Sequence, residues 1–349
     1  MQDTIAGPTG VIWDITYACP LRCTHCYSES GRRPSRQLGL ADMLRVADAL
    51  ASLRPELVTL AGGEPTLVPG LDRVAQRFTA AGIPVGVYTS GWRLTPETAG
   101  SLARAFDVVT VSVDGATAAV HDRIRGRAGS FDRALAAAEL LDTIAGRERA
   151  AGPARFRLGL DFVVTRGNFD QLDDFCTAVV PRLRHVDTVS FAAVVPTGLA
   201  SRPGFAAAEL LTEEQMAALS DGRLAQRLAS LVPAGVTVTV GDNLELRMDP
   251  AGRAAHPGFR PLQVEPDGAV RAMPIYEGTV GDLRTEPAQE LWRRAVRRWD
   301  DDFVVRTLAP VRTMAEWAEA TRRLDRHFAS PEVAARLIRR PDFVIPVAG

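Results

Sequence analysis

Residues 10–27 have the sequence GVIWDITYACPLRCTHCY, an apolar strand-like run followed by three closely spaced cysteines. Cys19, Cys23 and Cys26 form a C-x3-C-x2-C pattern. With only four cysteines in 349 residues, chance produces this spacing in roughly one chain of two thousand. Cysteines this close together do not link distant segments, but they suit a metal site in a reducing compartment such as the cytosol.

The number of cysteines indicates what they bind. Thiolates suit zinc, copper(I) and iron-sulfur clusters. Structural zinc takes four protein ligands, and the side chain of His25, next to Cys26, is poorly directed towards the same tetrahedron. An iron-sulfur cubane held by three cysteines leaves one iron open for a substrate or cofactor. The triplet therefore favours a 4Fe-4S cluster, with a zinc site or simple buried thiols as alternatives.

The pattern outside the triplet predicts an α/β fold. Short β-branched runs alternate with longer alanine-, leucine- and arginine-rich segments of helical period. This alternation predicts parallel strands in a partial (β/α)6 TIM-like barrel, with the chemistry at the carboxyl ends of the strands. The expected strands are residues 10–16, 57–61, 85–89, 108–113, 157–164 and 188–194. The expected helices are residues 39–52, 70–81, 96–105, 130–145, 168–184 and 212–231.

The pattern changes after a further expected strand at residues 236–240. Strand-turn-strand signals follow around residues 263–273, and then arginine-rich helices. They predict a smaller C-terminal α+β domain. We therefore expect a barrel at 1–205, a connecting helix and strand region at 206–255, and the C-terminal domain at 256–349, with residues 200–208 as a connecting loop.

Two motifs together resemble a known family. Residues 60–65 read LAGGEP at the end of the second expected strand, and with the cysteine triplet they resemble the radical S-adenosylmethionine (SAM) superfamily over roughly residues 10–200. The resemblance implies one 4Fe-4S cluster on Cys19, Cys23 and Cys26, with SAM chelating the open iron. It also implies that a reductant such as flavodoxin or ferredoxin supplies an electron that cleaves SAM. The resulting 5'-deoxyadenosyl radical abstracts hydrogen from a substrate.

The resemblance also implies which residues surround SAM. The glutamate of the second motif would accept from the SAM amino group, next to close-approaching backbone, and residues at the ends of the third and fourth strands would lie by methionine, ribose and carboxylate. The side chains on either side of the third cysteine would pack against the adenine of SAM. The implied cofactor-binding residues are Gly62, Gly63, Glu64, Pro65, His25, Tyr27, Ser90, Ser112, Asp114, Arg123 and Asn168.

Several of these residues have a plain structural alternative. Ser112 and Asp114 also suit ordinary caps and turns, and Asn168 suits a helix N-cap. Arg123 or Arg125 could hold a carboxylate bidentately or form a surface ion pair. Cys176, expected in mid-helix, is better placed as a small buried side chain than as a hydrogen donor. No residue is assigned to catalysis.

The C-terminal stretch from residue 262 to 292 resembles the SPASM auxiliary domain. That domain normally carries cysteines for further clusters, but this sequence has Met273 at the characteristic position and no cysteine after Cys176. The resemblance therefore implies a SPASM-like scaffold without auxiliary clusters. The absence of auxiliary clusters favours redox-neutral chemistry such as epimerisation, decarboxylation or dehydration.

The expected function is radical modification of a natural-product intermediate such as a sugar, cyclitol or nucleoside. The alternative is a maturase of a ribosomally synthesised peptide, because residues 27–33, YSESGRR, resemble mycofactocin-type maturases. RNA modification and a non-catalytic iron-sulfur protein are less favoured, since the net charge of -1 gives no basic surface for nucleic acid. No secretory signal or membrane-spanning run is visible, so a cytoplasmic location is expected.

Overall fold

One mixed sheet forms the centre of the fold. The computed structural model describes residues 6–152 and 156–344. Within them, ten strands follow the order β10-β9-β8-β1-β2-β3-β4-β5-β6-β7. All pairs from β8 to β7 are parallel, whereas β9 pairs antiparallel with both its neighbours. The strands are β1 (Gly10–Thr16), β2 (Leu57–Gly62), β3 (Val85–Thr89), β4 (Val108–Ser112), β5 (Arg157–Val164), β6 (Thr188–Ala193), β7 (Thr237–Gly241), β8 (Pro261–Val264), β9 (Ala269–Arg271) and β10 (Thr279–Asp282).

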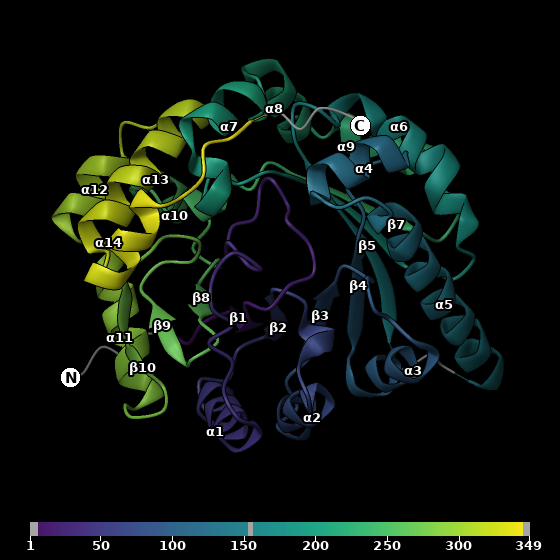
Figure 1. Ribbon diagram of the computed structural model, residues 1–349, viewed down its shortest axis with the longest axis horizontal. Coiled ribbons are helices and arrows are strands. Elements are labelled where there is room, and N and C mark those ends of the chain that lie inside the picture. Colours follow the sequence, from purple (N-terminus) through teal and green to yellow (C-terminus); the bar gives the residue numbers. More distant parts are fainter. Residues whose placement is uncertain (1–5, 153–155, 345–349) are drawn as a thin grey trace.

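The sheet curves into an open barrel with helices on its outer face. Figure 1 shows this crescent, with the dark purple segment after β1 inside it and the yellow-green C-terminal helices at one end. The helices are α1 (Leu40–Ala51), α2 (Leu71–Ala80), α3 (Pro96–Ala105), α4 (Ala118–Arg125), α5 (Ser130–Ala151), α6 (Leu172–Asp174), α7 (Pro203–Ala208), α8 (Glu213–Ser220), α9 (Arg223–Leu231), α10 (Pro250–Ala255), α11 (Ala288–Trp299), α12 (Asp302–Leu308), α13 (Met314–Phe328) and α14 (Pro331–Ile338).

Apolar side chains at helical spacing attach the outer helices to the sheet. In α2, the buried residues are Leu71, Val74, Ala75 and Phe78, which lie on one face of a helix of 3.6 residues per turn.

Within the described part of the chain, none of the helices combines the length and the apolar composition of a membrane-spanning segment.

The expected α/β barrel is confirmed, and strands β1, β3 and β5 begin and end at the expected residues. The single helix expected at 168–184 is wrong. That stretch is broken into two 3-10 turns, the short α6 and a π-helical turn at Phe175–Val179. Proline at position 181 lacks the amide hydrogen that a regular helix needs there.

The helix expected at 212–231 is two helices, α8 and α9. Gly222 lies between them in the left-handed conformation, with φ of 75°. A regular helix cannot pass through that conformation.

The connecting loop expected at residues 200–208 is also wrong. Gly198–Ser201 is a 3-10 turn and Pro203–Ala208 is α7. Leu199, Ala200 and Phe205 are fully buried there, so this segment belongs to the core.

The C-terminal region continues the barrel sheet. β8 pairs in parallel with β1 from Gly10 opposite Pro261 to Trp13 opposite Val264, and β9 and β10 extend the sheet from β8. One sheet therefore crosses the boundary expected near residue 256. The three-part division of the chain stays a prediction.

Candidate functional site

The three cysteines lie in the segment that follows β1, inside the curve of the sheet (Figure 1). All three are free and partly exposed. We call residues 17–38 the cysteine loop. It lies at the carboxyl ends of the parallel strands, where barrel enzymes place their chemistry.

Three neighbouring segments clamp the cysteine loop through backbone hydrogen bonds. The Gly63 amide donates to the Thr16 carbonyl at 2.7 Å, and the Glu64 amide donates to Ala18 at 2.8 Å. At the end of α4, the carbonyls of Ile124 and Arg125 accept from Thr24 and Arg22, and the Leu199 amide donates to the Cys26 carbonyl at 3.0 Å. The loop is therefore held independently of any metal.

Glycine is required at two of these contacts. A Cβ on Gly63 would lie 2.2 Å from the Ala18 carbonyl oxygen, and one on Gly198 would lie 2.2 Å from the Tyr27 carbonyl oxygen. Gly198 also has φ of 53°, which disfavours any other residue. A side chain at either position would displace the cysteine loop.

The thiols are the donor type that an iron-sulfur cluster takes. Among the described residues, no three His, Cys, Asp or Glu side chains form a group that could hold a metal ion. Burial raises the pKa of the Cys23 thiol to about 11, but the Arg125 guanidinium, 4.0 Å from its sulfur, favours the thiolate that a cluster requires. The donor set therefore fits an iron-sulfur cluster.

Glu64 is fully buried and has a complete set of internal partners. Its Oε1 accepts from the Thr66 amide and from the hydroxyls of Thr66 and Thr89, both at 2.7 Å. Its Oε2 accepts from the amide and hydroxyl of Ser90, at 2.8 and 2.5 Å. A ligand ammonium group must replace one of these hydroxyl donors. Ser90, which follows the next strand, β3, thus meets Glu64 directly.

Asp114 is the centre of a second buried cluster beside the cysteine loop. Its Oδ2 lies 2.6 Å from Arg125 Nε and 3.7 Å from His25 Nε2, while its Oδ1 accepts from the Val163 amide. Burial by itself raises the pKa of Asp114, but Arg125 and then His25 and His121 hold it below its ordinary value overall. Asp114 is therefore an anion that orients Arg125 and His25.

His25 has one free ring nitrogen in this cluster. Burial lowers the pKa of His25 to about 4 despite the nearby Asp114, so the ring is neutral. Its Nδ1 is buried without a hydrogen-bond partner. An orphaned buried polar atom is costly in the absence of a ligand, which supports the expected contact with a cofactor.

Tyr27 connects the cysteine loop to the C-terminal region. Its hydroxyl donates to Asp14 Oδ1 at 2.5 Å, Gln263 donates to Asp14 Oδ2 at 3.0 Å, and the Ile275 amide donates to the same glutamine at 2.6 Å. Burial raises the pKa of Asp14 to about 6. Tyr27, which directly follows Cys26, therefore ties the cysteine loop to β1 and, through Gln263, to the C-terminal region.

The other expected residues have mainly structural partners. Asn168 uses its amide for bonds to Thr165, Asp114 and Val163, and Arg123 pairs with Glu209 at 2.7 Å. Their contact with a cofactor stays a prediction, as it does for Ser112, which ends β4 and is partly exposed. Cys176 is fully buried, as expected for a small core side chain.

A comparison with known families identifies the domain that holds these residues. Residues 13–144 match the model of the radical SAM superfamily. The chain carries a radical SAM domain. The matched region includes the cysteine triplet, the Glu64 turn and Asp114.

Curated relatives match about half of the chain. Mycofactocin maturase MftC of Mycobacterium tuberculosis is 40% identical over 172 residues, 49% of this chain and 41% of its own. AdoMet-dependent heme synthase of Methanosarcina barkeri is 31% identical over 51% of this chain and 57% of its own. PqqA peptide cyclase of Ruegeria pomeroyi is 31% identical over 49% and 43%. The chain spans less than two thirds of the length of each relative.

Similarity in fold to a solved structure extends beyond residues 13–144. The crystal structure of Streptococcus suis SuiB bound to S-adenosylmethionine superposes with a TM-score of 0.63 over 89% of this chain and 72% of SuiB, at 14% identity. The likeness in fold therefore extends beyond residues 13–144 into the C-terminal region. A SPASM-like identity for residues 256–349 stays a prediction.

The geometry adds two residues that the motifs do not single out. Arg125 links Cys23 to Asp114, although the sequence favours Arg123 and Arg125 equally. Asp14 lies within β1 and is fully buried, and a lone acidic residue in an apolar strand is the signal that could have found it.

Proposed function

We propose that this chain is a radical SAM enzyme that modifies a ribosomally made peptide. The single observation that carries the radical chemistry is the cysteine loop, which places Cys19, Cys23 and Cys26 at the carboxyl end of the barrel and is held there by the matched domain. Three cysteines leave one iron of a cubane open.

The residues present would hold two cofactors. Cys19, Cys23 and Cys26 would ligate the 4Fe-4S cluster, and the turn from Gly62 to Pro65, with Ser90, would face SAM. When bound, these cofactors supply a 5'-deoxyadenosyl radical that takes a hydrogen atom from the substrate.

The chain itself contributes position and charge. Arg125 places a positive charge beside Cys23, Asp114 holds Arg125 in place, and the neutral His25 offers its unpartnered Nδ1. The cysteine loop lies inside the curve of the sheet (Figure 1), a position that would limit the access of water to bound cofactors. A flavodoxin- or ferredoxin-type reductant stays a prediction.

The relatives support the peptide alternative over a sugar, cyclitol or nucleoside. The maturase and the peptide cyclase each match about half of the chain, at 40% and 31% identity. Since the chain spans less than half the length of either relative, the substrate is part of the proposal. Because a heme synthase is also among the relatives, a tetrapyrrole serves as the control substrate.

The test is formation of 5'-deoxyadenosine by the anaerobically reconstituted, reduced full chain. We expect turnover of SAM by the wild type and by Cys176→Ala, whose cysteine is buried outside the triplet. Cys23→Ala should lose at least about a hundredfold of this activity, because it removes a cluster ligand. Equal product from Cys23→Ala and Cys176→Ala would overturn the proposed chemistry.

The substrate class is tested by isotope transfer. We expect deuterium to appear in 5'-deoxyadenosine when a deuterated precursor peptide encoded beside the gene is supplied. Transfer from a deuterated tetrapyrrole or a deuterated nucleoside, with none from the peptide, would overturn the peptide assignment and leave the radical chemistry intact.

A further inference from the structure

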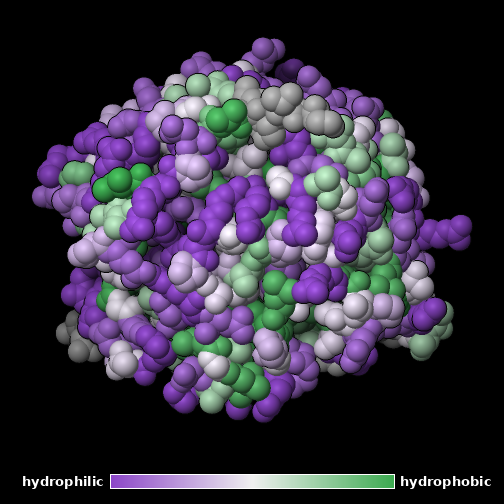
Figure 2. All heavy atoms as spheres, viewed as in Figure 1, coloured by the Kyte–Doolittle hydropathy of each residue, from purple (hydrophilic) through white to green (hydrophobic). Residues whose placement is uncertain are grey.

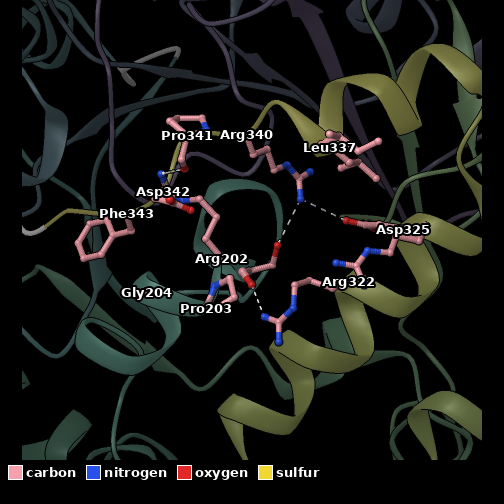
Figure 3. A pocket seen from close by; sticks show the side chains of 13 residues that line it. Arg202, Pro203, Gly204, Arg322, Asp325, Leu337, Arg340, Pro341, Asp342 and Phe343 are labelled. Atoms are coloured by element: carbon pink, nitrogen blue, oxygen red, sulfur yellow. Dashed lines mark hydrogen bonds and ion pairs between the residues drawn. The ribbon is translucent and has the colours of Figure 1, made fainter.

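A cavity of about 540 Å³ lies between α7, α13 and the segment that follows α14. Figure 3 shows its arginine side chains converging from these elements. We call it the arginine cavity. Its charged lining residues are Arg202, Arg322, Arg326, Arg340, Asp325 and Asp342.

Two of the four arginines are already paired with carboxylates. Arg340 lies 2.8 Å from Glu29 and 3.7 Å from Asp325, and Arg322 pairs with Glu319. Burial and the carboxylate of Glu277 raise the pKa of Asp325 to about 7, which weakens its negative charge in the cavity.

The other two arginines have no carboxylate partner among the described residues. Arg202 is only 9% exposed, and its guanidinium donates to the carbonyls of Leu199, Pro341 and Thr24. Burial, together with the positive charges of Arg32 and Arg340, lowers its pKa to about 10. Arg326 is exposed and has no ion pair. A buried cation without a counter-ion is costly, so the cavity favours an anion.

A second cavity of about 330 Å³ lies on the other side of the same C-terminal segment, since Arg340 and Pro341 line both. Arg32 and Arg339 line it, and they too have no carboxylate within ion-pair distance in the described structure. Arginines without a carboxylate partner therefore lie on both sides of this segment, and Glu29 and Glu332 also line the second cavity.

The arginine cavity is coupled to the cysteine loop. Arg202 Nη2 donates to the carbonyl of Thr24 at 2.9 Å, and Thr24 directly follows Cys23. A ligand that contacts Arg202 therefore lies one side chain away from the cluster-binding segment.

We propose that the arginine cavity binds a carboxylate of an acidic segment of the peptide substrate. This rests on the proposed function. Guanidinium groups bind carboxylates bidentately, and Leu337 and Phe343 give the cavity apolar walls suited to a side-chain stem. Figure 2 shows one face of the molecule, on which hydrophilic side chains predominate and apolar groups are scattered.

The experiment measures fluorescence anisotropy of labelled decapeptides on the anaerobically reconstituted full chain. One peptide is built from glutamate and glycine, and its control has glutamine in place of glutamate. Arg326→Gln removes an exposed, unpaired cavity arginine, so folding should be preserved. Arg323→Gln, on the same helix but outside the cavity lining, is the matched control.

We expect the glutamate peptide to bind, with affinity at least fivefold weaker for Arg326→Gln and unchanged for Arg323→Gln. The glutamine peptide should not bind. Equal weakening by both variants, no binding by the wild type, or tighter binding of a single-stranded DNA decamer would overturn the proposal. SAM cleavage in the same preparation is scored separately: cleavage without peptide binding overturns the cavity assignment alone, and binding without cleavage overturns the radical chemistry alone.

Discussion

Buried ionisable side chains beside the cysteine loop are each held in one protonation state by their partners. His121 is 1% exposed, and its Nδ1 accepts from the Asp114 amide at 3.1 Å, which requires an unprotonated nitrogen. Burial and the charge of Arg125 lower the pKa of His121 to about 4. The neutral ring thus fixes the backbone next to the Asp114 carboxylate.

His121→Gln tests this protonation state. The unfolded histidine binds a proton near pH 6.5 and the folded one near pH 4, so the contribution of His121 to stability is lost as the pH falls between these values. The slope approaches about 1.4 kcal/mol per pH unit. We expect the stability advantage of wild type over His121→Gln, measured by urea unfolding, to shrink from pH 7 to pH 4.5. Exposed His256→Gln should show no such change, and a constant advantage would contradict the assignment.

Asp114→Asn tests the ion pair itself. It leaves the buried Arg125 guanidinium without its carboxylate, and breaking a buried pair typically costs about 3 kcal/mol. We expect this loss in the free energy of unfolding of the cofactor-free chain. Exposed Asp132→Asn should change it by less than about 0.5 kcal/mol. A similarly small effect of Asp114→Asn would contradict this account, because it would show that the buried Arg125 guanidinium does not need the Asp114 carboxylate.

At the scale of helices and strands, the cysteine loop is positioned by contacts with turns and helix ends that are distant in the sequence. Strand periods and glycine turns predict β1 to β6 from local signals alone, and the cysteine spacing predicts the metal site. The sequence could not predict that Glu64 bonds Thr89 and Ser90, or that Leu199 bonds Cys26, because these contacts join residues that are distant in the chain. The π-helical turn around Cys176 likewise depends on packing.

Gly198→Ala tests the clamp on the loop. The added Cβ would meet the carbonyls of Tyr27 and Cys26 at 2.2 and 2.7 Å. We expect the iron bound per chain after reconstitution to fall at least about threefold. Gly129→Ala is the matched control, since Gly129 also has positive φ, of 75°, but nothing within 4 Å. Equal iron content in the two variants would contradict the role of the clamp.

On the scale of the whole molecule, the barrel sheet continues into the C-terminal region. β8 pairs with β1, and Gln263 joins Asp14 to Ile275. The sequence predicts a separate C-terminal unit because the secondary-structure pattern changes after residues 236–240. Pairing between strands some 250 residues apart leaves no local signal.

Hydrogen exchange tests whether β1 and the C-terminal strands open together. We expect the amides of β1 and β8 to exchange with the same opening free energy, within about 1 kcal/mol, because opening either one exposes the other. Native-state exchange in urea read by mass spectrometry measures both. Opening of β8 and β9 at a much lower free energy than β1 would show a separate C-terminal unit.

The most direct test of the central claim is electron paramagnetic resonance of the reduced, reconstituted chain with and without SAM. We expect a 4Fe-4S signal in the wild type and in Cys176→Ala, and a clear change in that signal when SAM is added, because three cysteines leave one iron open to SAM. Cys26→Ala should lose the signal or its response. A fully loaded, reducible cluster whose signal is unchanged by SAM would contradict the assignment of this site.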